Sequence, residues 1–143
     1  MTRQARVLVV EDADDWRETL AGVLRDDGHL VREATTYKEA VTWLRSDIFH
    51  VAVVDLRLDE WDLNDFQGMD LIAQLRSLSE EGKGMSVVIV TGYGGLQEAR
   101  DAFKPPLSVF DFLGKKEFDI EEYKSVIRDA IAAAYAGMAN TGR

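Results

Sequence analysis

Four short, largely apolar runs constrain the fold of this chain more than any other feature of its sequence. They span residues 7–10, 51–54, 87–90 and 109–113. Short runs rich in valine and other apolar residues are typical of strands that are buried on both faces of a parallel sheet. A fifth pattern, at residues 29–34, is mixed in polarity, so we expect that strand nearer an edge of the sheet.

Helical patterns fill the segments between these strands. They begin near Trp16, at Thr36, at Met69, at Leu96 and at Asp119. The second pattern carries a capping-box signal, because Glu39 follows Thr36 by three residues. Alternating strand and helix patterns predict an α/β fold, here a doubly wound five-stranded parallel sheet with five helices.

Polar side chains stand where the predicted strands end. Glu11 and Asp12 follow the first strand, Asp55 the third, Thr91 the fourth and Lys115 the fifth. Ligands of open α/β sheets bind at the edge formed by the carboxyl ends of the strands, so these side chains predict a site there. Taken singly, the acid pair could instead be a helix N-terminal cluster and the threonine a strand residue. Asp55 could instead pair with Lys115 for structure alone, but such an ion pair would be costly to bury.

In this order, the five polar positions resemble the receiver domain of bacterial two-component response regulators, over about residues 6–136. The resemblance implies a flavodoxin-like fold with strand order 2-1-3-4-5. It implies a domain that takes a phosphoryl group from a histidine kinase or a histidine phosphotransfer protein. A downstream protein or output domain would then bind the changed surface. A second copy of the chain could also bind it and form a homodimer.

The resemblance also assigns a metal and an acceptor. Glu11, Asp12, Asp55 and the backbone carbonyl of Arg57 would hold Mg²⁺, or Mn²⁺ in its place, and Asp55 would accept the phosphoryl group. Mg²⁺ binds about six oxygens and usually keeps several waters, so a few carboxylates suit it.

The remaining assignments concern the response to phosphorylation. Thr91 would supply a hydroxyl donor and Lys115 a positive charge. Lys104 is followed by proline, as the family's lysine often is, but it precedes the fifth strand and cannot reach the site edge. Phe112 falls at the family's aromatic switch position, with a plain core residue as the alternative.

Three features depart from the family's pattern. Lys116 stands where proline is common, and the loop at residues 59–67 is long, acidic and aromatic. That loop is either a lid or docking loop or a tolerated surface insertion. Arg57 and Tyr93 are bulky at the two positions that tune the life of the acyl phosphate, which predicts slow loss of phosphate.

Composition narrows the function further. The net charge of −9 and the pI of about 4.7 oppose binding to nucleic acid. The chain has no cysteine and no apolar run of the roughly 20 residues that a membrane helix needs. We expect a cytoplasmic signalling domain rather than an enzyme, with no membrane contact. The histidines, His29 and His50, are expected as surface or packing residues away from the site.

Two alternatives stay open. One is a degenerate receiver that binds a partner without phosphorylation, and the other is a Mg²⁺-dependent enzyme on a flavodoxin-like scaffold. We expect residues 1–138 to form the receiver domain and residues 139–143 a flexible tail or the start of a linker. The chain is either a stand-alone receiver or one cut from a longer regulator.

Overall fold

A five-stranded parallel sheet forms the centre of the protein. The computed structural model describes residues 3–55, 72–74, 84–92, 100–101, 103–104 and 108–141. The sheet has the order β2-β1-β3-β4-β5, and every neighbouring pair is parallel. Its strands are β1 (Arg6–Val10), β2 (Leu30–Ala34), β3 (Val51–Val54), β4 (Ser86–Thr91) and β5 (Asp111–Gly114). The predicted doubly wound topology is confirmed.

Three of the four apolar runs become the buried strands β1, β3 and β4, because their side chains fill the cores on both faces of the sheet, whereas β5 is largely only partly buried. In β1, Val7 and Val9 join one core cluster, and Leu8 and Val10 join the other. Side chains of a strand alternate between its two faces, so a strand that is covered on both sides must be apolar throughout. All six positions of β4 are buried for the same reason.

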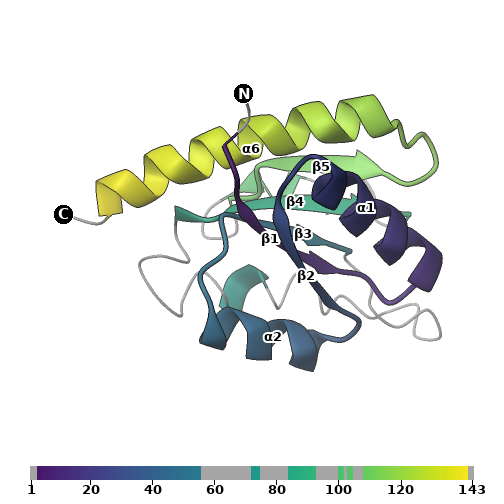
Figure 1. Cartoon of the computed structure of the whole chain (residues 1–143), viewed down its shortest axis with the longest axis horizontal. Coiled ribbons are helices and arrows are strands. Elements are labelled where there is room, and N and C mark those ends of the chain that lie inside the picture. Colours follow the sequence, from purple (N-terminus) through teal and green to yellow (C-terminus); the bar gives the residue numbers. More distant parts are fainter. Residues whose placement is uncertain are drawn as a thin grey trace.

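Helices cover both faces of the sheet, as Figure 1 shows: α1 (Asp14–Asp26) and α6 (Ile120–Thr141) lie on one side and α2 (Tyr37–Ser46) on the other. The predicted capping box of α2 is present, since the Thr36 side chain accepts a hydrogen bond from the backbone N–H of Glu39. Gly28 follows α1 with φ of 92°, a left-handed conformation that suits glycine and ends the helix.

The helix predictions are confirmed where the structure describes them. Three of the five expected helices are α1, α2 and α6. The expected helices at 69–79 and 96–103 fall largely outside the described residues, but 72–74, Arg100, Asp101 and Phe103 are helical. Gly84, just before β4, is also helical.

Two boundaries differ from the predictions. Strand β5 begins at Asp111 rather than at Val109, and Ser108 before it has a positive φ of 47°. Helix α6 continues to Thr141, into the segment predicted as a flexible tail, while the domain boundary at 138 remains a prediction. Over the described part of the chain, we find no helix with the length and apolarity to cross a membrane.

Candidate functional site

The sheet aligns the predicted site residues at one edge. Glu11 directly follows β1, Asp55 follows β3, Thr91 ends β4 and Lys115 follows β5. The parallel ladder continues just past the strand ends: the Asp55 N–H donates to the Val10 carbonyl at 3.1 Å, and the Lys115 N–H donates to the Thr91 carbonyl at 2.9 Å. The backbone therefore fixes where each side chain starts.

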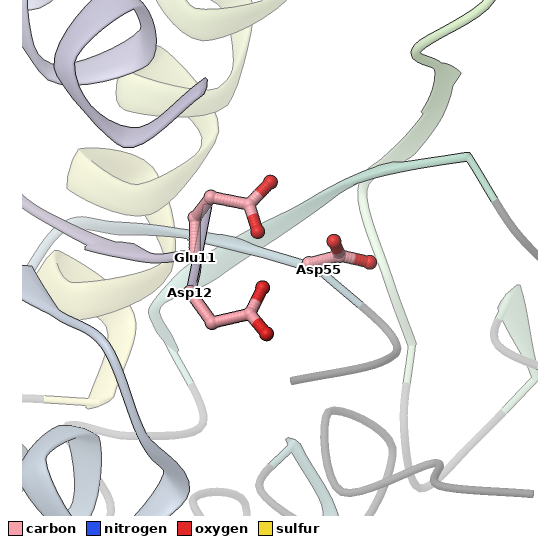
Figure 2. A group of neighbouring side chains, drawn as sticks. All are labelled: Glu11, Asp12 and Asp55. Atoms are coloured by element: carbon pink, nitrogen blue, oxygen red, sulfur yellow. The ribbon is translucent and has the colours of Figure 1, made fainter. Parts of the chain in front are cut away.

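Three carboxylates meet at this edge. Carboxylate oxygens of Glu11, Asp12 and Asp55 lie within 4.8 Å of one another. Figure 2 shows the three side chains converging, with the two from the end of β1 facing the one from the end of β3. Glu11 is 1% exposed and Asp55 is 3% exposed, while Asp12 is partly buried. Close, buried carboxylates form an oxygen-rich pocket of the kind that a hard divalent cation binds.

Both oxygens of Asp55 receive hydrogen bonds. The Thr91 hydroxyl donates to Oδ1 at 2.6 Å, and the Lys115 ammonium donates to Oδ2 at 2.9 Å. Lys115 also donates to Oε1 of Glu11, so one ammonium bridges two carboxylates that belong to different strands. Charge-assisted hydrogen bonds of this kind are stronger than neutral ones and fix the geometry of the site.

The charges of the site shift its pKa values. Burial and the charge of Asp55 raise the pKa of Glu11 to about 8, and the contact with Lys115 only partly opposes this. Burial lowers the pKa of Lys115, but its hydrogen bonds and ion pairs with Glu11 and Asp55 outweigh burial and raise it. The site therefore favours a bound cation and disfavours additional negative charge.

The other predicted residues have mixed outcomes. Arg57, Tyr93 and the loop at 59–67 lie outside the described residues. Phe112 is partly buried and packs against the core cluster on the α2 face, which leaves its switch role a prediction. Gly92 is exposed, and among the described residues a Cβ atom there would meet Cδ of Lys115, at 3.9 Å.

Sequence reasoning missed one residue of the site. The sequence places Trp16 only near the start of the first helical pattern, and its ring packs against the core cluster on the α1 face. Its ring centroid also lies 5.1 Å from Nζ of Lys115. Helical spacing shows that Trp16 faces inward, but it cannot show which distant side chain its ring meets.

The histidines lie at the opposite edge of the sheet, as expected. Nδ1 of His29 accepts a hydrogen bond from the Ala5 N–H at 3.1 Å, and Nδ1 of His50 accepts one from the Arg6 N–H at 3.0 Å. Both contacts are at the start of β1, so neither imidazole takes part in the acidic site.

Comparison with known proteins links this site to a family. A family model described as the response regulator receiver domain matches residues 7–128. The alginate biosynthesis transcriptional regulatory protein AlgB of Pseudomonas putida is 34% identical over 101 residues, which are 71% of this chain and 21% of that protein. The transcriptional regulatory protein ZraR of Escherichia coli is 27% identical over 94% of this chain and 28% of its own length. This chain thus spans well under a third of either relative.

Solved structures share the fold. NtrX from Brucella abortus superposes with a TM-score of 0.81 at 24% identity, over 98% of this chain and 29% of that chain. A CheY-like response regulator receiver domain protein from Methanospirillum hungatei superposes with a TM-score of 0.80 at 19% identity, over 94% of this chain and 98% of that chain. The second comparison matches nearly the whole of both chains.

Proposed function

This chain belongs to the response regulator receiver domain family, and from that premise we propose that Asp55 accepts a phosphoryl group and thereby switches a protein-interaction surface. The observation that carries the proposal is the pair of donors on Asp55. The Thr91 hydroxyl contacts one carboxylate oxygen and the Lys115 ammonium contacts the other. A phosphoryl group on either oxygen would have both donors within reach.

The acid cluster supports Mg²⁺ as the cofactor, with Mn²⁺ as a substitute. Glu11, Asp12 and Asp55 have only oxygen ligands to offer, and these lie close enough together to share one ion. The backbone carbonyl of Arg57 would add a fourth protein oxygen. When bound, the metal would neutralise charge on the oxygens of the transferring phosphoryl group.

The residues of the chain have distinct parts in the transfer. An oxygen of Asp55 forms a bond to phosphorus, while the bond from phosphorus to its donor breaks and the donor leaves with the electron pair. Lys115 offsets negative charge that develops on the phosphoryl oxygens. The Thr91 hydroxyl can turn from the carboxylate to a phosphoryl oxygen, which would couple phosphorylation to a movement of β4.

The donor is a histidine kinase or a histidine phosphotransfer protein, and a downstream protein or output domain reads the result. A regulatory protein such as ZraR is several times longer than this chain, which is consistent with receivers that act beside an output domain. In this proposal, residues 1–138 form the receiver and work in the cytoplasm. The domain neither binds nucleic acid directly nor acts as an enzyme on a separate substrate.

The test is the intact mass of the protein after incubation with acetyl phosphate and Mg²⁺. The parent should gain one phosphoryl group, whereas Asp55→Asn and a parent sample with excess chelator should gain none. Asp129→Asn is the matched control, because Asp129 is an exposed acid on α6 away from the site. It should gain phosphate as the parent does.

Each contrary result has a defined meaning. Phosphoryl gain by Asp55→Asn would show that another residue is the acceptor. No gain by a folded parent, with acetyl phosphate and with phosphoramidate, would favour a receiver that binds its partner without phosphorylation.

A further inference from the structure

The Lys115 ammonium has a third neighbour besides its two carboxylates. Nζ lies 5.1 Å from the ring centroid of Trp16, within the range of a cation–π interaction. Among aromatic side chains, tryptophan attracts a cation most strongly. The lysine side chain is 15% exposed, so water weakens this attraction less than it would at an open surface.

The indole is itself held in place by other rings. Phe118, in the loop after β5, contacts Trp16 edge-on, with centroids 5.3 Å apart and an interplanar angle of 89°. Phe118 in turn contacts Tyr123 at 5.3 Å. Tyr123 is fully buried, and its hydroxyl donates to the Leu20 carbonyl of α1 at 3.0 Å. The aromatic series therefore joins α1, the loop after β5 and α6.

A neighbouring ring can restrict the position of a lysine ammonium. The charge of lysine sits at the end of a flexible four-carbon chain, so two carboxylates alone let it move between them. Glu11 and Asp55 compete for the same ammonium. A fixed indole face on a third side restricts that movement and favours the position in which the ammonium reaches both acids.

We propose that Trp16 is a positioning residue of the phosphoacceptor site, which holds the Lys115 ammonium beside Asp55 through a cation–π contact. This inference rests on the proposed function of Asp55. The competing explanation is that Trp16 only packs against the core. A leucine could replace the packing of Trp16, but only an aromatic ring presents a π face to the ammonium, so the two explanations predict different series of variants.

The first measurement is independent of phosphorylation. In protein labelled with ¹³C-lysine, the ring current of Trp16 should shift the Lys115 ε-methylene resonance upfield, and Lys115→Met identifies that resonance by its loss. Trp16→Phe should keep part of the shift, and Trp16→Leu should abolish it. An unchanged Lys115 resonance in Trp16→Leu would overturn the proposed contact.

The second measurement is the rate of phosphoryl gain from acetyl phosphate with Mg²⁺. Trp16→Leu should slow it roughly three- to tenfold, as loss of a partly shielded cation–π contact would do, and Trp16→Phe should restore much of the rate. Trp43→Phe is the matched control. Trp43 also carries a cation over its ring, Arg32 at 5.3 Å, but it packs on the other face of the sheet. Its rate should equal that of the parent.

The outcomes separate this inference from the function on which it rests. A parent that gains no phosphate overturns both. A phosphorylated parent with an equally fast Trp16→Leu overturns the role of Trp16 alone. Equal slowing in Trp16→Phe and Trp16→Leu would assign Trp16 to packing. Where Trp16→Leu fails to fold, Trp16→Met takes its place as the non-aromatic variant, because methionine adapts to irregular core gaps.

Discussion

The two edges of the central sheet bury ionisable side chains in opposite ways. Where the strands end, buried Glu11 and Asp55 face the ammonium of Lys115. Where the strands begin, His29 and His50 each accept a hydrogen bond from a backbone N–H of β1. One edge is held by charges that oppose and attract one another, and the other is held by neutral rings.

The imidazole edge is arranged to stay neutral. Each Nδ1 accepts a hydrogen bond, so protonation there would set two donors against each other. Burial lowers the pKa of His29, although the charge of Asp27 partly opposes this, and burial together with the charge of Arg6 lowers the pKa of His50. His50 also stacks on Tyr135 of α6, with ring centroids 4.5 Å apart.

The difference separates a stabilising edge from a binding edge. The histidines complete hydrogen bonds that the start of β1 needs. Among the described residues, the acidic edge brings three carboxylates together with one ammonium. Negative charge is therefore in excess, and binding of an added cation would be favourable there. Side chains with shifted pKa values can therefore mark a binding site at one edge of the sheet and a stabilising contact at the other. Variants can test this difference.

Removing the ammonium of Lys115 should have the largest effect. In metal-free protein near pH 8.5, Lys115→Met leaves Glu11 and Asp55 facing each other, and the free energy of unfolding should fall by roughly 3 kcal/mol. Denaturant unfolding measures this. Lys104→Met is the matched control: its lysine is 68% exposed and should cost under about 0.5 kcal/mol. Equal effects would show that Lys115 does not hold the acidic edge together.

The acidic edge should also lose stability as pH rises. The pKa of Glu11 is about 8 in the folded protein against an ordinary value of 4.5 for a glutamate, so between these values the folded state keeps a proton that the unfolded chain has lost. The free energy of unfolding then falls with rising pH, by up to about 1.4 kcal/mol per unit from this group. Glu11→Gln should flatten that decline in chelator-treated protein.

The control for Glu11→Gln is the same substitution at an exposed glutamate. Glu121→Gln, in the first turn of α6 with a side chain 80% exposed, should leave the pH profile of the parent unchanged. If Glu11→Gln keeps the parent's slope between pH 6 and 8, the folded protein does not hold a proton on Glu11.

Much of the acidic edge could be predicted from sequence, for a physical reason. An apolar run encodes a strand, and the polar residue after it must lie at the strand's end, so Asp55 and Thr91 could be placed without knowing any contact. Parallel strands then bring such ends together. Neither the reach of Lys115 to two acids at once nor the ring of Trp16 beside it follows from spacing, because both depend on side chains that are 60 to 104 residues apart in the sequence.

The opposite edge shows where sequence reasoning ends. The expectation that His29 and His50 lie away from the site was correct, but their backbone partners at Ala5 and Arg6 could not be read from any motif. A start of β5 at Val109 was also wrong. Hydrophobicity marked Val109 as buried, which it is, but the positive φ of Ser108 and the ladder that begins at Asp111 are backbone properties.

The imidazole edge should titrate with the opposite sign to the acidic edge. Both histidine pKa values are lowered from the ordinary value of 6.5, so below that pH the unfolded chain binds protons that the folded state excludes. The free energy of unfolding should fall as pH decreases from about 6.5 toward 5. His29→Asn and His50→Asn keep an oxygen acceptor near Nδ1 without a titrating group, and each should reduce this loss.

The double variant sharpens the comparison. The chain has two histidines, so His29→Asn with His50→Asn leaves no imidazole, and any remaining slope comes from carboxyl groups. In the parent, the opposing slopes should give maximal stability near pH 6.5. An unchanged slope in the double variant would contradict neutral imidazoles as the cause.

The smallest expected effect tests how tightly α6 packs beside the start of β4. Gly84 precedes that strand, and an added Cβ there would lie 3.1 Å from the Met138 nitrogen and 3.3 Å from the Gly137 carbonyl carbon. Gly84→Ala should therefore lower the free energy of unfolding by about 1 kcal/mol. At Gly137, a Cβ would meet Gly84 atoms at 3.4 Å, an ordinary contact, and alanine favours a helix by up to about 1 kcal/mol. Gly137→Ala should be neutral or stabilising in thermal unfolding. Equal losses in both variants would mean that α6 packs as closely at Gly137 as at Gly84, with no room for a methyl group on either side.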